Sequence, residues 1–181
     1  MTIVPDGKDW TWVLGRPCPE CGLDTQAFAR EEIPAMITAN AAAWRGPLAA
    51  PDAAERPRPD RWSALEYGCH VRDVFRLYDY RLGLMLTEDD PLYPNWDQDQ
   101  TAIADDYASQ NPATTAAELA SAADALAASF AAVTGDQWLR PGRRGDGAAF
   151  TVETFGRYFI HDPIHHLHDV TGLRPPTGST A

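Results

Sequence analysis

The stretch WSALEYGCHVRDVFRLYDYRLGLM, residues 62–85, contains the clearest helix signal in the chain. Ser63 and Glu66 form an S-x-x-E capping box, in which each side chain accepts a hydrogen bond from a backbone N–H near the start of a helix. Apolar side chains then recur every three or four residues, on one helical face, at Tyr67, Val71, Val74, Tyr78, Leu82 and Met85. His70 lies beside this stripe and is predicted to face inward.

The flanking segments predict a further helix and a long connection. Residues 33–48 carry apolar side chains three or four apart, and Pro34 suits the first turn of a helix. Residues 88–111 mix prolines, acids and aromatics, and they are long for a connection, because most connections have about 4–6 residues. A connection of this length can cross a bundle, so the two helices that it joins are predicted to run parallel.

Two more helices are predicted in the C-terminal part. Asn111 with Pro112, or Thr115 with Glu118, can cap an alanine-rich helix, and Thr151 can cap the last one. The turn-rich residues 139–150 can form a loose hairpin, but no segment alternates with the period of a strand. The predicted fold class is therefore all-α, a four-helix bundle with a long crossover between its second and third helices.

The domain limits follow from the same pattern. Residues 1–24 are predicted to be an irregular, cysteine-containing leader, residues 25–174 the bundle, and residues 175–181 a mobile tail.

Composition excludes several classes of partner. A net charge of -11 and a pI near 4.7 argue against binding to nucleic acid or to an anionic membrane surface. No apolar run approaches the roughly 18–20 residues that cross a bilayer, and the N-terminus does not read as a signal peptide. Three cysteines do not suggest a disulfide framework, so a cytoplasmic protein is predicted.

Histidines carry the functional signal. His161 and His165 are four residues apart, which places both imidazoles on one face of the last helix. His70 from the second helix can complete a three-histidine site for one divalent ion, which leaves a coordination position open for water or substrate. The predicted metal ligands are therefore His70, His161 and His165, and the alternative is that the three histidines are merely structural.

The residues around this pair leave several questions open. Pro163 either kinks the last helix or begins a new one after Asp162, and the kink is favoured because the apolar spacing continues on both sides. Asp73 and Asp162 can orient a ligating imidazole or can be surface acids beside arginines. His166 is expected to be a partly exposed histidine outside the site.

Cys18 and Cys21 form a Cys-Pro-Glu-Cys motif in the leader. A structural zinc site needs four ligands, and the chain has no second Cys-x-x-Cys. A thioredoxin-like redox role needs a βαβ context, which is not predicted here. The motif is then a turn with two thiols, or half of a metal site that is completed elsewhere in the chain or across a dimer.

W-S-A-L-E-Y-x-x-H at residues 62–70 and H-D-P-I-H-H at residues 161–166 resemble the DinB/YfiT-like superfamily, over roughly residues 33–172. The resemblance implies a four-helix bundle with up-down-down-up topology. It also implies a metal triad from the second helix and an H-x-x-x-H pair of the fourth, which again maps to His70, His161 and His165. Zinc or nickel is the usual ion in that family and dimers are frequent, so a homodimer is implied. The cysteine-bearing leader departs from the family pattern.

The same resemblance implies a function. Several actinobacterial members are similar to transferases or isomerases that use mycothiol, including maleylpyruvate isomerase-like enzymes. The implied activity is a metal-dependent thiol transferase or isomerase acting on a small electrophilic substrate, with one divalent ion and mycothiol as cofactors. The alternatives are a metal-dependent hydrolase that uses metal-bound water, and a non-catalytic metal-binding stress protein. The sequence identifies no residue for proton transfer.

Overall fold

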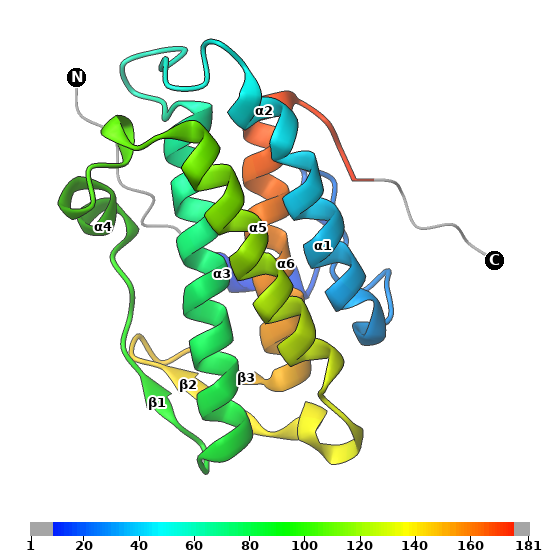
Figure 1. Cartoon of the computed structure of the whole chain (residues 1–181). Coiled ribbons are helices and arrows are strands. Elements are labelled where there is room, and N and C mark those ends of the chain that lie inside the picture. Colours follow the sequence, from blue (N-terminus) through cyan, green and yellow to red (C-terminus); the bar gives the residue numbers. More distant parts are fainter. Residues whose placement is uncertain (1–8, 176–181) are drawn as a thin grey trace.

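The computed structural model describes residues 9–175. Its centre is a bundle of four helices, α1 (Ile33–Ala43), α3 (Ala64–Thr87), α5 (Pro112–Ala131) and α6 (Val152–Thr171). In Figure 1, α1 and α6 rise while α3 and α5 descend, and the crossover between α3 and α5 runs along the outside. α1 and α3 each contact both α5 and α6. The predicted four-helix bundle is therefore confirmed.

Short elements complete the chain. They are α2 (Arg45–Ala49), α4 (Gln98–Ala104) and the 3-10 helices η1 (Thr11–Leu14), η2 (Arg30–Glu32), η3 (Tyr107–Ser109) and η4 (Gly135–Leu139). Within residues 9–175, no helix is both long enough and apolar enough to cross a membrane.

The helix starts follow the capping signals. The Ser63 hydroxyl accepts from the Glu66 N–H at 3.2 Å, and the Glu66 carboxylate accepts from the Ser63 N–H at 2.8 Å, which completes the capping box of α3. Asn111 caps α5, with Pro112 in the first turn, and Thr151 caps α6. These caps satisfy backbone donors that have no partner inside the helix.

The all-α prediction needs one correction, because the structure contains a small sheet. β1 (Leu92–Tyr93) pairs in parallel with β2 (Pro141–Arg144), which pairs antiparallel with β3 (Ala149–Thr151). The sheet lies at the end of the bundle where α3 ends and α6 begins (Figure 1). Strands this short cannot show a period-two alternation, and β1 belongs to the crossover, so only the β2–β3 hairpin had a sequence signal.

The described part of the leader, residues 9–24, packs against the bundle. η1 contacts α6, and Val13, Cys18 and Cys21 are buried in the core. The last helix ends at a left-handed Gly172. The predicted mobile tail, apart from Pro175, lies outside the described residues.

Candidate metal centre

α6 presents two pairs of side chains of the types that ligate metals, in adjacent register. His161 and His165 form one i,i+4 pair, and Asp162 and His166 form the other. Consecutive helical residues differ by about 100° around the axis, so the two pairs face different neighbours. α6 is a single helix with Pro163 inside it, and no new helix begins at Asp162.

Asp162 and His166 face α3, where they meet His70. One donor atom from each of the three side chains lies within 4.8 Å of the others. The His70 Nε2 atom is 3.4 Å from Asp162 Oδ1, and the His166 Nε2 atom is 3.8 Å from Asp162 Oδ2. The rings of His70 and His166 are nearly perpendicular, with centroids 4.8 Å apart. Two imidazoles and one carboxylate therefore converge on one point.

Three of the polar atoms at this point, on His70 and Asp162, are buried without a hydrogen-bond partner among the described residues. His70 is fully buried, and among residues 9–175 neither of its ring nitrogens has a hydrogen-bond partner. Asp162 Oδ1 is also buried and unpartnered in the described part of the chain, because its contact with His70 lacks hydrogen-bond geometry. Each such group costs about 1–3 kcal/mol in a native protein unless a ligand, ion or water satisfies it. The donor set therefore fits a divalent cation.

Asp169 orients His166 toward the same point. Its Oδ2 atom lies 3.2 Å from His166 Nδ1. Burial raises the pKa of Asp169, but the hydrogen bond from His166 and the nearby charges of His166, His165 and Arg61 together outweigh burial, so the pKa lies below its usual value. An ionised carboxylate only accepts hydrogen bonds, so the proton of His166 sits on Nδ1 and the Nε2 lone pair is directed at the centre.

The charge of the centre suits a cation as well. Burial raises the pKa of Asp162, but His166 and His70 outweigh burial and lower it to about 2. Asp162 is therefore a carboxylate at neutral pH, and its side chain is 33% exposed, so solvent reaches this edge of the centre.

Three aromatic rings pack against the two histidines of this group. The Trp96 ring from the crossover stacks on His70 at 5.3 Å between centroids, with an interplanar angle of 10°. Trp62 lies 5.6 Å from His70, and Tyr67 lies 5.1 Å from His166. These walls restrict access by water and strengthen electrostatic interactions inside the centre.

The other pair faces the leader. There His161 and His165 meet Cys18 and Cys21, and one donor atom from each of the four lies within 4.8 Å of the others. Burial lowers the pKa of His161 to about 4 and raises the pKa of Cys21 to about 12. Both side chains are therefore neutral at pH 7 when no cation is bound.

The structure thus places the three predicted ligands in two groups instead of one. His161 and His165 lie together, as predicted, whereas His70 belongs to the group of Asp162 and His166. From the sequence, Asp162 is expected either to orient a ligating imidazole or to be a surface acid, and His166 is expected to lie outside the site. Their i,i+4 spacing is the signal that could have identified them, since it equals that of His161 and His165.

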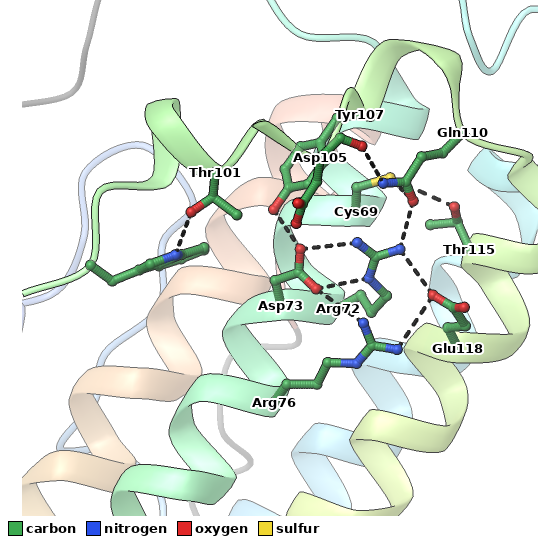
Figure 2. A network of polar contacts seen from close by, with 11 residues as sticks. Cys69, Arg72, Asp73, Arg76, Thr101, Asp105, Tyr107, Gln110, Thr115 and Glu118 are labelled. Carbon is green, nitrogen blue, oxygen red and sulfur yellow. Dashed lines mark hydrogen bonds and ion pairs between the residues drawn. The ribbon is translucent and has the colours of Figure 1, made fainter. Parts of the chain in front are cut away.

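Asp73, the other carboxylate considered from the sequence, anchors the crossover (Figure 2). It accepts hydrogen bonds from both Arg72 Nε and Nη2 at 2.9 Å and from the Tyr107 hydroxyl at 2.5 Å. Arg72 also donates to Gln110 at 2.7 Å and to Glu118 of α5 at 3.0 Å. This network joins α3, the crossover and α5, and the same crossover carries Trp96 to His70.

A sequence model of the DinB superfamily matches residues 37–170. The chain belongs to the DinB superfamily. The resemblance seen in the sequence is therefore confirmed, and Cys18 and Cys21 precede the matched residues.

Among solved structures, this DinB-superfamily chain is similar to YfiT from Bacillus subtilis. The TM-score is 0.63 and the identity is 22%, over 82% of each chain. YfiT is described as a probable metal-dependent hydrolase with an unusual four-helix bundle topology. At this identity the similarity supports the fold alone. No curated protein matches the chain.

Proposed function

We propose that the protein is a metal-dependent enzyme that holds a divalent ion through His70, Asp162 and His166. One observation carries the proposal. Buried donor atoms of His70 and Asp162 converge at one point and have no hydrogen-bond partners among the described residues, and His166, oriented by Asp169, lies beside them. Buried polar atoms without a partner are rare in native proteins, and a bound ion accounts for them.

The donor set favours hydrolysis. Three protein ligands leave a coordination position open, and two histidines with one carboxylate is a ligand set used by zinc hydrolases. When bound, such an ion supplies Lewis-acid chemistry and lowers the pKa of a coordinated water. The exposed edge of Asp162 is the side from which water and substrate can approach. The description of YfiT as a probable metal-dependent hydrolase supports the same assignment.

A cavity beside the centre is proposed to hold the part of the substrate that does not react. It has a volume of about 440 Å³ and lies between the α2–α3 connection and the end of α6. Trp62, Tyr67 and Asp169 line it, and the same three side chains contact His70 or His166. None of the three proposed ligands lines the cavity, so it orients the substrate and does not activate it.

A thiol-dependent transferase or isomerase uses the same centre differently, with a thiol such as mycothiol in the open position. No donor in the centre distinguishes this reaction from hydrolysis, so the experiment below separates them. The small-molecule substrate, the homodimer and the cytoplasmic location stay predictions.

The test combines metal content with turnover. Protein reconstituted with zinc or nickel is assayed against a panel of activated esters, lactones and amides, with and without an added low-molecular-weight thiol. We expect hydrolysis in the absence of thiol. His70→Ala and Asp162→Asn should lose this activity, and His168→Ala should keep it. His168 is on the same helix and belongs to neither donor group, so it is the matched control.

Each outcome decides between the candidates. Turnover that requires thiol would replace hydrolysis by thiol transfer at the same centre. If His70→Ala and Asp162→Asn each bind as many metal ions per chain as the wild type, the proposed centre is refuted.

A further inference from the structure

The Cys-Pro-Glu-Cys motif of the leader lies against α6, although the two segments are far apart in the sequence. Its two thiols meet His161 and His165, and the four donor atoms lie within 4.8 Å of one another. All four side chains are buried, with no more than 7% of any residue exposed. Cys18 Sγ is 3.7 Å from His165 Nδ1. We propose that Cys18, Cys21, His161 and His165 form a second, structural zinc site.

An unsatisfied imidazole points independently to a ligand there. His161 Nε2 is buried, and it has no hydrogen-bond partner among residues 9–175. His161 is buried between His165, with ring centroids 5.1 Å apart, and Trp10, whose ring centroid is 5.4 Å away. A metal ion that His161 binds through Nε2 would satisfy this nitrogen, which has no other partner in the described part of the chain.

The second histidine is oriented from outside the group. His165 directs Nδ1 toward Cys18, while its Nε2 lies 3.6 Å from Glu20 Oε2 and 3.7 Å from Asp169 Oδ2. Carboxylates on the far nitrogen of a histidine fix its tautomer and ring orientation in metal sites. Glu20 lies inside the Cys-Pro-Glu-Cys motif, so the loop supplies two ligands and one orienting group.

The loop has the backbone of a chelating turn. The Cys18 N–H donates to the Leu23 carbonyl and the Gly22 N–H donates to the Cys18 carbonyl, both at 2.9 Å. Gly22 has a φ of +82°, a conformation that glycine adopts without strain. The turn thus brings residues 18 and 21 to the same side of the loop, toward α6.

The donor set identifies the ion and its role. Two thiolates and two imidazoles favour zinc, and the Cys-x2-Cys and His-x3-His spacings fall within those of Cys2His2 sites. Four protein ligands fill a tetrahedral coordination sphere, so no position remains for substrate. Trp10 covers both histidine rings at 5.4 and 5.1 Å, which keeps this group closed. It therefore differs from the three-donor group at His70, which solvent reaches.

The proposed zinc would hold two segments of the chain together. Zinc fastens the leader, which precedes the family match at residues 37–170, to the middle of α6. Because His161 and His165 each precede a proposed ligand of the other centre by one residue, the structural zinc also fixes the rotation of α6 that directs Asp162 and His166 at His70.

Cobalt substitution tests the site without relying on turnover. Full-length protein purified under reducing conditions is stripped of metal and titrated with Co²⁺, whose thiolate charge-transfer absorption reports only ions bound to cysteine. We expect this absorption to saturate at one ion per chain and to disappear in Cys18→Ser and Cys21→Ser. It should persist in Cys69→Ser, a buried cysteine that contacts Gln110 and Thr115 instead.

A second measurement keeps the proposal testable if a variant does not fold. In the wild-type protein, zinc should slow the reaction of Cys18 and Cys21 with a thiol reagent at least tenfold, and a chelator should reverse this protection. Asp162→Asn should leave the thiolate absorption intact, which separates this site from the proposed catalytic one. Absence of thiolate absorption in the folded wild type, or a Cys18–Cys21 disulfide that persists in zinc and reductant, would overturn the proposal.

Discussion

His165 and His166 are consecutive in α6, yet they belong to different donor groups. Their rings are nearly perpendicular, at 79°, with centroids 5.8 Å apart. His165 lies with the cysteines of the leader, and His166 lies with His70 of α3. One helix thus separates a closed group of four donors from a partly open group of three donors. A closed set of four ligands is typical of structural metal sites, and a set of three with an open position is typical of catalytic ones.

Asp169, which orients His166 in the group of His70, Asp162 and His166, gives one prediction. Asp169→Asn keeps an acceptor for His166 Nδ1 but removes its charge, so we expect affinity for zinc at the His70 group to fall about 10–100-fold. Competition with a chromophoric chelator measures the change. Asp79→Asn is the control, because Asp79 accepts a hydrogen bond from Ser129 and belongs to neither group. Equal affinities of wild type and Asp169→Asn would show that Asp169 does not position the ligand.

Close packing of α6 against α1 and α5 gives a second prediction. A Cβ at Gly156 would lie 2.8 Å from Ile33 Cδ1 and 2.9 Å from Phe130 Cε1. Gly156→Ala should therefore destabilise the protein by about 1–2 kcal/mol, because overpacking outweighs the better helix propensity of alanine. Urea unfolding measures the difference.

The matched control for this substitution lies in α3. No described atom lies within 4 Å of a Cβ built on Gly83, which is exposed. Gly83→Ala should stabilise the protein by about 0.5–1 kcal/mol through propensity alone. Effects of the same sign at both glycines would contradict the packing argument.

The network that anchors the crossover gives a third prediction. Asp73→Asn removes the more buried of the two carboxylates that pair with the buried Arg72 guanidinium, and we expect a loss of about 3 kcal/mol in the free energy of unfolding. Glu118→Gln removes a more exposed partner of the same arginine and should cost about 0.5 kcal/mol or less. If the two substitutions cost the same, Asp73 is not the centre of the network.

The capping box of α3 gives a prediction about pH. Burial raises the pKa of Glu66, but the Arg56 guanidinium and the Ser63 backbone outweigh burial, so the pKa lies below its usual value. A lowered folded-state pKa contributes stability above the unfolded value, about 4.3, and this stability is lost as the pH falls through the folded value. Glu66→Gln should therefore cost about 1–2 kcal/mol at pH 7 and progressively less below about pH 4. Urea unfolding across this range measures the difference, and a cost independent of pH would argue against the ion pair.

Local signals predicted much of this fold. Ser63, Asn111 and Thr151 each precede a helix, and the apolar stripes of α1 and α3 are buried. These features depend on residues a few positions apart, which the sequence displays directly. The hairpin of β2 and β3 matches the loose hairpin predicted at residues 139–150, but β1 escaped prediction, because it pairs with a strand far along the chain and is too short to alternate.

The grouping of the candidate ligands could be predicted only in part, for a different reason. The sequence predicts candidate metal ligands on α6, but it does not say which of two adjacent pairs faces α3. A rotation of one residue, about 100°, exchanges them. That rotation is decided by packing against the leader and α3. The sequence alone therefore leaves Cys18 and Cys21 as either a turn with two thiols or half of a metal site that is completed elsewhere.

Anomalous diffraction at the zinc edge, on crystals of the zinc-loaded protein, tests the proposed three-ligand centre directly. We expect a peak bounded by His70, Asp162 and His166, with a position open on the side of Asp162. A single ion bound by His70, His161 and His165, or no peak beside His70, would contradict it.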